Sequence, residues 1–188
     1  MDKRMLCVLL CVCGLLVVPA AQAGPDDPGA HFTSDLGIAD GGDALVTFTY
    51  TTGSTKTLHA GEAAYLDGGL FYIFPSAPQW GLQTTVGWAR ASVNASNASV
   101  SFVRYPLDVI GFYNYGNNHF GLGATYHMSP TVRGGGLQNY DFDNALGLVL
   151  EYRYSFFGLR FTRINYTLSG ADRNFNGDSY GAFFNFTF

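Results

Sequence analysis

The chain has 188 residues, the length of one domain, and a formal net charge of -4. Only 13% of its residues are charged, where a soluble domain has about 25%, whereas 16% are aromatic and 24 are glycines. This composition argues against nucleic-acid binding, which needs a basic surface, and it is unusual for a soluble domain.

Residues 1–23 have the form of a secretory signal peptide. Basic residues precede an apolar run at 5–18, and the small residues of "AAQA" allow cleavage between Ala23 and Gly24. The run is shorter than the about 20 residues of a transmembrane helix, so we expect a cleaved signal and not an anchor. All three cysteines lie inside this segment, at positions 7, 11 and 13. We therefore expect an exported chain without disulfides.

Residues 24–42, "GPDDPGAHFTSDLGIADGG", are polar and acidic and contain prolines. Segments of this composition bury too little apolar surface to fold by themselves, so we expect a short disordered periplasmic lead-in. The folded domain would then cover residues 43–188.

The first two predicted strands lie at 44–51 and roughly at 55–74. "ALVTFTYT" alternates apolar side chains with threonines, which is the period of a β-strand. The second segment is longer than one membrane crossing by a strand needs. An alternative is that "ALVTFTYTTGSTKTL" forms a separate periplasmic hairpin, and the strand count of the domain would then fail.

The same alternation continues in "WGLQTTVGWAR" and "FGLGATYHM" and is longest in "FDNALGLVLEYRYSF", residues 142–156. One face of this last segment carries leucines at its centre and aromatic residues at its ends. A lipid-facing band between two aromatic girdles has this arrangement, so we expect Leu148 near the bilayer midplane.

The segment "FGLRFTRINYTL" departs from the pattern, because its apolar residues change parity between Phe161 and Ile164. A β-bulge near Thr162 and Arg163 would restore a single apolar face.

Seven turn clusters separate these segments and predict eight strands. Alternate connections are short and long, as in barrels with short periplasmic turns and long external loops. The predicted fold class is all-β, an eight-stranded antiparallel up-and-down transmembrane β-barrel.

The whole mature chain resembles the small eight-stranded outer-membrane β-barrel families, the group that includes opacity-type and OmpA-type transmembrane domains. "GGDALVTFTYTTGSTKTLHAGEAAYLDGGLFY" is similar to the opening of proteobacterial barrels of this sort. The resemblance implies a monomer in a Gram-negative outer membrane, in contact with membrane lipid and lipopolysaccharide. It also implies insertion by the barrel-assembly machinery, which would recognise the aromatic face of the terminal strand: Tyr180, Phe184, Phe186 and Phe188.

Six charged residues are expected to face the barrel lumen: Asp67, Arg104, Asp108, Glu151, Arg153 and Arg160. The interior of an eight-stranded barrel is just wide enough to be filled by side chains, and an unpaired charge there would be costly. We expect a packed network in which three positive charges balance three negative ones. The alternative is a narrow pathway for ions or small solutes.

His127 and Ser129 of "YHMSP" resemble the catalytic pair of the lipid A deacylase barrel, with Asp141 as an orienting acid. Their predicted face also carries Thr125 and glycines, so it looks into the lumen, whereas a lipid hydrolase needs its nucleophile beside acyl chains. We therefore expect a hydrogen-bonded polar pair at the barrel mouth and no enzyme. No histidine has a neighbouring ligand pattern, so neither a metal nor another cofactor is expected.

The sequence favours a non-enzymatic outer-membrane barrel with a structural or surface-interaction role through loops at 129–141 and 169–178. The alternatives are a narrow pore, a deacylase-like membrane hydrolase, and a lipocalin-like carrier, which would turn its aromatic residues inward around a ligand cavity.

Overall fold

The computed structural model describes residues 27–49, 53–94, 99–134 and 139–188. In these ranges no helix is long and apolar enough to cross a membrane. The eight long strands are β1 (Gly29–Asp40), β4 (Ala63–Ile73), β5 (Trp80–Asn94), β6 (Ser99–Tyr115), β7 (Asn118–Gly134), β9 (Ala145–Tyr154), β10 (Phe157–Arg163) and β13 (Ser179–Thr187).

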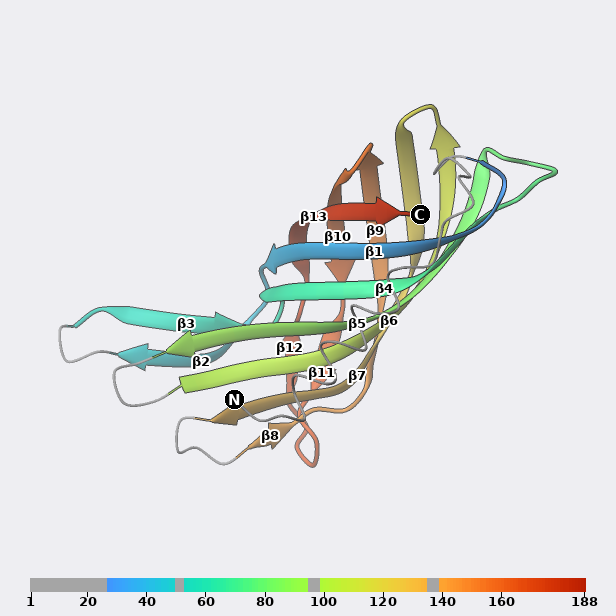
Figure 1. Ribbon diagram of the computed structural model, residues 1–188. Helices are drawn as coiled ribbons and strands as arrows, with labels where there is room; N and C mark the ends of the chain where they lie inside the picture. The colour runs from blue at the N-terminus through green and yellow to red at the C-terminus, as the bar shows by residue number, and fades with distance from the viewer. Residues whose placement is uncertain (1–26, 50–52, 95–98, 135–138) are drawn as a thin grey trace, which may run out of the picture.

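The long strands form one closed antiparallel sheet. They pair in the order β6-β5-β4-β1-β13-β10-β9-β7, and β7 pairs back with β6, so the sheet closes into a barrel (Figure 1). The predicted all-β class and the eight-stranded antiparallel up-and-down barrel are therefore confirmed. Shorter strands lie outside the ring: β2 (Ala44–Thr49), β3 (Thr55–His59), β8 (Tyr140–Asp141), β11 (Asn165–Thr167) and β12 (Asn174–Asn176).

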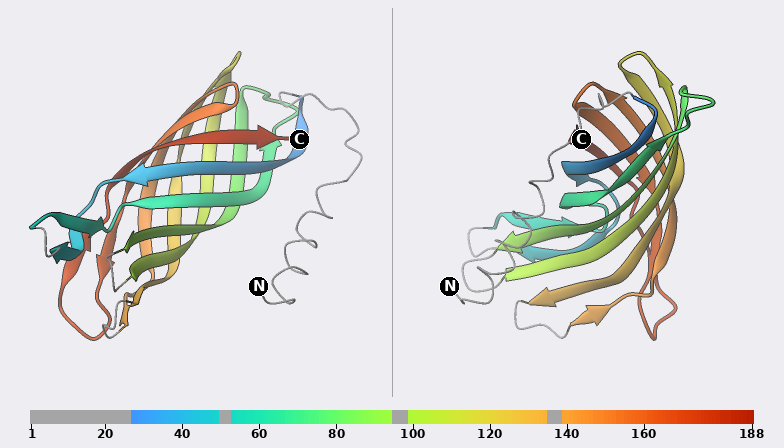
Figure 2. Two further views of the ribbon diagram at one scale, coloured as in Figure 1. Left: turned by 60° about the vertical axis from the view of Figure 1, so that its left-hand side comes forward. Right: turned by 45° about the vertical axis from the view of Figure 1, so that its right-hand side comes forward.

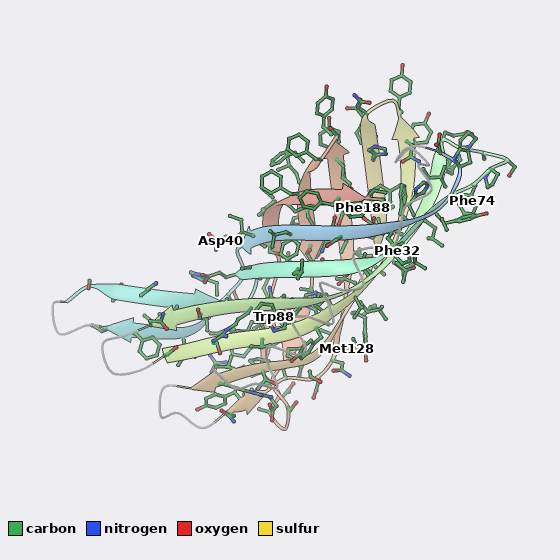
Figure 3. All side chains as sticks on the ribbon, viewed as in Figure 1. Phe32, Asp40, Phe74, Trp88, Met128 and Phe188 are labelled. Atoms are coloured by element: carbon green, nitrogen blue, oxygen red, sulfur yellow. The ribbon has the colours of Figure 1, made fainter. Side chains whose placement is uncertain are left out.

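The two faces of the barrel differ in polarity because side chains alternate along each strand. In β9, Leu146, Leu148 and Leu150 point outward and are exposed, whereas Val149 and Glu151 point inward and are buried. Many aromatic and aliphatic residues of the other long strands also lie on the outer face, which includes Phe32, Trp88 and Phe188 (Figure 3).

The two ends of the barrel also differ. At one end the connections are short, at 74–79, 116–117 and 155–156. The beginning of β1 and the C-terminal residue meet there, since the backbones of Phe32 and Phe188 exchange hydrogen bonds of 3.1 and 2.9 Å. The opposite end carries the long connections with the hairpins β2–β3 and β11–β12 (Figure 2). We call the connections at this end, residues 41–62, 139–144 and 164–178, the cap.

The disordered lead-in predicted for residues 24–42 is wrong from Gly29 onward, because Gly29–Asp40 is the first barrel strand. It pairs with β4 on one side and β13 on the other. Its inward residues include His31, Thr33 and Asp35, so its high polarity reflects a polar lumen and not disorder. The predicted signal segment and its cleavage site lie outside the described residues.

The assignment of residues 44–51 and 55–74 as two barrel strands is also wrong. β2 and β3 pair with each other as a separate hairpin, and only β4 belongs to the ring. Gly41 and Gly42 turn the chain out of the barrel with φ angles of 131° and 81°, which only glycine adopts easily. The alternative of a separate hairpin is therefore confirmed, and the hairpin lies at the end away from the start of β1 and the end of β13. Its periplasmic placement stays a prediction. The predicted number of eight barrel strands is still correct, because β1 is a barrel strand that the sequence analysis did not include.

The predicted bulge at Thr162 and Arg163 is absent, since β10 pairs with both neighbours without a register shift. Ile164 and Tyr166 are buried beyond the end of β10, where they join an apolar core inside the cap. The change of parity therefore marks the place where the strand leaves the outer band. A register shift does occur in the ring between β6 and β7, where Ser129 has a φ of 47°.

The interior is filled in layers along the barrel axis. An apolar cluster around Phe102 and Tyr166 occupies the cap end, and a second one around Phe71 and Phe112 occupies the short-turn end. Buried charged side chains lie between the two. The described interior is thus filled by side chains at the cap end and in the middle, with a cavity of about 310 Å³ at the short-turn end.

Candidate functional site

The middle of the lumen holds a cluster of charged side chains, which we call the ion cluster: Asp35, Asp67, Asp108, Glu151, Arg153 and Arg160. Arg160 on β10 lies 3.3 Å from Asp67 and 3.1 Å from Asp108, and its Nε donates to Glu151 at 2.6 Å. One guanidinium thus bridges carboxylates from three other strands.

Arg153 on β9 forms the second half of the ion cluster. Its guanidinium donates to Glu151 at 2.6 Å and to the amide oxygen of Gln83 at 2.8 Å, and lies 3.6 Å from Asp35. The same group stacks over the ring of Phe112, 4.4 Å from the ring centroid. Buried arginines of this kind need several partners to offset their desolvation, and Arg153 has them.

The structure brings together five of the six predicted lumen charges and leaves one apart. Arg104 is buried but donates to the backbone oxygens of Gly61 and Glu62, both at 3.1 Å, and so fastens the base of the cap. Asp35 and Gln83 were missed as cluster members. The alternation of Phe32, Thr33 and Asp35 with their neighbours could have shown that Asp35 lies on the inner face of a strand. The acidic composition of residues 24–42 favoured disorder instead.

The predicted charge balance of the lumen is wrong. The ion cluster contains four carboxyl groups and two guanidinium groups, because Asp35 joins it and Arg104 stays outside. Among the described residues, Oδ1 of Asp67 has no hydrogen-bond partner, and Asp108 is held by the ion pair between its Oδ2 and Arg160 at 3.1 Å. The cluster is tightly held by its arginines yet carries an acidic excess.

The predicted catalytic pair is not brought together. His127 is buried and its Nδ1 lies 2.6 Å from the hydroxyl of Tyr166, whereas Ser129 is exposed at the kink in β7. The expectation that both side chains share one face is therefore wrong, because the left-handed backbone at Ser129 interrupts the alternation. His127 instead joins the aromatic core of the cap. In the described part of the chain, no group of three or more histidine, cysteine or acidic side chains could hold a metal.

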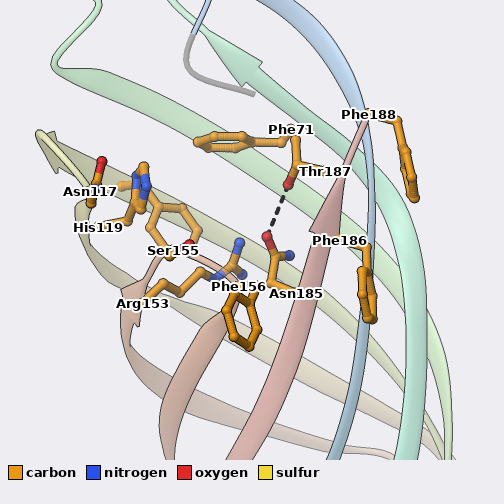
Figure 4. Close-up of a pocket in the computed structure, with 11 residues that line it drawn as sticks. Phe71, Asn117, His119, Arg153, Ser155, Phe156, Asn185, Phe186, Thr187 and Phe188 are labelled. Carbon is orange, nitrogen blue, oxygen red and sulfur yellow. Dashed lines mark hydrogen bonds between the residues drawn. The ribbon is translucent and has the colours of Figure 1, made fainter. Parts of the chain in front are cut away.

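The aromatic residues of the terminal strand lie as the alternation predicts. Tyr180, Phe184, Phe186 and Phe188 are all exposed on the outer face. Figure 4 shows Phe186 and Phe188 on the outside of β13, while Asn185 and Thr187 point into a cavity of about 310 Å³ at the short-turn end. The face is continuous and available for contact, and its recognition by the assembly machinery stays a prediction.

The cap is a single hydrogen-bonded unit and not a set of free loops. The backbone N–H of Asp43 donates to Asn176 O at 2.7 Å, and the carboxylate of Asp43 accepts from Asn176 N at 2.8 Å. Ser169 Oγ donates to Asp143 at 2.7 Å, and Ile164 N donates to Asp178 at 3.0 Å.

An apolar core closes this unit. It contains Leu58 from β3, Phe142 from the connection before β9, and Phe175 from β12. Predicted loop regions 129–141 and 169–178 therefore belong partly to an ordered surface, together with the hairpin β2–β3, which the sequence offered as an alternative to two barrel strands. This surface is the candidate interaction site.

Comparison with known proteins gives little beyond the fold. No protein-family model matches the sequence, and no curated protein matches it. Among solved structures, the chain is similar to Ail, the attachment invasion locus protein of Yersinia pestis, determined in complex with the heparin analogue sucrose octasulfate. The TM-score is 0.46 and the identity 14%, over 85% of this chain and 99% of that chain. A likeness this distant carries no argument about function, and the assignment as an eight-stranded β-barrel rests on the strand pairing of this chain itself.

Proposed function

We propose that the protein is an integral outer-membrane β-barrel, without enzymatic activity, that acts at the cell surface through its ordered cap. The observation that carries this proposal is the inverted polarity of the barrel. Its outer face exposes Leu36, Leu70, Leu122 and Leu148 among many other apolar residues, whereas its lumen holds the ion cluster. A soluble protein rarely exposes apolar patches beyond a few hundred Å², and a membrane barrel must expose a band all round.

The orientation follows from the two ends. Outer-membrane barrels have short turns on the periplasmic side and longer connections outside. The short turns and both barrel termini of this chain share one end, and the cap occupies the other. The cap would then face the medium. The C-terminal end of β13 would lie on the periplasmic side, where the assembly machinery meets its substrates. Membrane lipid and lipopolysaccharide would surround a monomeric barrel.

The filled lumen favours a structural or surface-interaction role over the pore alternative. The ion cluster fills the centre of the barrel, and the buried Phe102 and Tyr166 fill the cap end. A carrier with an internal ligand site is disfavoured for the same reason. The separation of His127 from Ser129 removes the observation that had suggested a hydrolase.

Cysteine labelling would test location and orientation together. The described residues contain no cysteine, so Asp172→Cys in the cap and Ser76→Cys in a short turn each introduce a single reactive thiol there. We expect a membrane-impermeant maleimide to label the first variant on intact cells and the second only after lysis. Both should fractionate with the outer membrane and show heat-modifiable gel mobility. Recovery in the soluble periplasmic fraction, or labelling of both variants on intact cells, would refute the proposal.

A further inference from the structure

The cap contains a cavity of about 310 Å³. It lies where β2 meets the β7–β8 ladder and the connection that carries β11 and β12. Its walls are mainly apolar and come from four separate segments of the chain: Leu45, Val46, Val132, Phe142, Leu168 and Phe175. We call it the cap pocket.

The walls of the cap pocket are held in place by contacts made elsewhere. Phe142 packs edge-to-face on Phe175 with ring centroids 5.7 Å apart, and it forms a β-bridge with Leu168. Its backbone N–H also donates to Pro130 O at 2.9 Å. Val132 is buried in the cap core. A pocket with such fixed walls needs little rearrangement to accept a ligand.

One charged side chain, Arg173, lines the cap pocket. Its guanidinium lies over the ring of Phe175, 4.8 Å from the centroid. Among the described residues the guanidinium has no carboxylate within ion-pair distance and no hydrogen-bond acceptor. Its backbone is fixed, because Arg173 N donates to Ala171 O and Leu168 N donates to Arg173 O, both at 2.9 Å. Arg173 is exposed, and the ring of Phe175 is the contact that holds its guanidinium at the pocket, so the cation is not neutralised by a carboxylate there.

We propose that the cap pocket binds a small carboxylate with a short apolar body, of about the size of a phenylalkanoate. The apolar walls would take the body, and the planar fork of Arg173 would take the carboxylate through two parallel hydrogen bonds. The volume lies at the lower end of the roughly 300–1,000 Å³ of small-molecule sites. A polyanion is a poor fit because the lining offers a single cation.

This inference deepens the proposed function, and it rests on that function only for the exposure of the pocket to the medium. The binding itself is a property of the folded chain. It can be measured on purified protein in lipid nanodiscs, so its failure is distinguishable from a failure of the labelling experiment on cells.

Titration calorimetry with 4-phenylbutyrate as the probe tests the proposal, with empty nanodiscs as the blank. We expect saturable binding to the wild-type protein and binding about tenfold weaker to Arg173→Gln, since a charge-assisted hydrogen-bond pair is lost. The matched control is Arg133→Gln, an exposed arginine on β7 that does not line the pocket, which should bind as the wild type does.

The neutral analogue 4-phenyl-1-butanol separates the two halves of the site. It should bind about tenfold more weakly than the acid and show no difference between wild type and Arg173→Gln. Val46→Trp, which fills the pocket, should abolish binding of both compounds while heat-modifiable mobility remains. Equal affinities for acid and alcohol, unchanged binding to Arg173→Gln, or heats no larger than those of empty nanodiscs would each overturn the proposal.

Discussion

Arg160 reaches from β10 across the lumen to carboxylates on β1, β4, β6 and β9, the most distant being Asp35 at 4.0 Å. Removing it would leave four buried carboxyl groups with Arg153 as the single remaining cation of the ion cluster. Burial determines how much such a change costs in free energy of unfolding, because a charge that loses its partner inside a protein keeps its desolvation penalty.

The first prediction concerns this residue. Arg160→Met should lower the free energy of unfolding by about 3–5 kcal/mol, because it breaks a buried ion network without removing its acids. Arg163→Met is the matched control, since Arg163 lies on the same strand but is exposed, and should change stability by less than about 1 kcal/mol. Urea unfolding of refolded protein measures both. Equal effects of the two variants would contradict the ion cluster's role.

The second prediction also concerns a single residue but on the outer face. Leu148, the residue expected at the bilayer midplane, pairs with the exposed Arg163, whereas Leu150 is 50% exposed and pairs with Phe161 and Leu122. Leu150→Arg should therefore cost roughly 2–4 kcal/mol in lipid, because it places a charge within the apolar band. Asp172→Arg in the cap should cost little. Urea unfolding in lipid vesicles compares them, and equal tolerance of both changes would argue against a membrane-embedded face.

Strand β13 and the hairpin β2–β3 contribute to the folded molecule in different ways, one inside the ring and one outside it. β13 is the last strand and pairs with β1 and β10, so it closes the barrel. The β2–β3 hairpin is outside the ring, yet Leu58 on β3 is fully buried in the cap core. The hairpin thus lies outside the barrel sheet but packs into the cap core.

The third prediction is that the end of β13 matters more for assembly than for stability. Phe188→Ala keeps the backbone hydrogen bonds to Phe32 but removes the terminal aromatic ring. We expect less folded protein in the outer membrane and unfolded chains in the periplasm. Phe156→Ala is the control, because Phe156 is 60% exposed at the same end where Phe188 is 58% exposed.

Fractionation and urea unfolding of refolded protein are both needed to separate assembly from stability. The two variants should be similarly stable after refolding in detergent, while only Phe188→Ala loses membrane yield. A normal yield for Phe188→Ala would mean that the strand end is not recognised. A parallel loss of yield and stability would mean that the ring acts through packing.

The fourth prediction concerns the hairpin. Leu58→Ala should lower the free energy of unfolding by roughly 2–5 kcal/mol, the range for removing a fully buried leucine. Lys56→Ala on the same strand is exposed and should have almost no effect. Urea unfolding distinguishes them, and a neutral Leu58→Ala would show that the hairpin is independent of the cap core.

The whole molecule is a closed barrel whose lumen is filled by one charged and two apolar layers. The fifth prediction is that purified protein shows no stable conductance in planar bilayers, because the ion cluster and the buried residues around Phe102 occupy the lumen. Reproducible ion-selective conductance would restore the pore alternative. Detergent without protein serves as the blank.

The sequence by itself determined the fold class, the outer apolar band and five residues of the ion cluster. These features depend on an alternation with period two, which is local and therefore visible in one chain. The same local rule correctly placed the outward face of the terminal strand, including Phe184 and Phe186.

Only the tertiary structure decided which polar segments belong to the barrel and which inward residues meet. β1 looks like a disordered tail until its partners β4 and β13 satisfy its backbone and the ion cluster receives Asp35. β2 looks like a barrel strand until the glycines before it turn it into the cap. Arg104 and Arg160 share the same inward alternation, but one bonds to backbone and the other to acids from distant strands. The register between strands far apart in sequence sets these contacts, and no local pattern contains it.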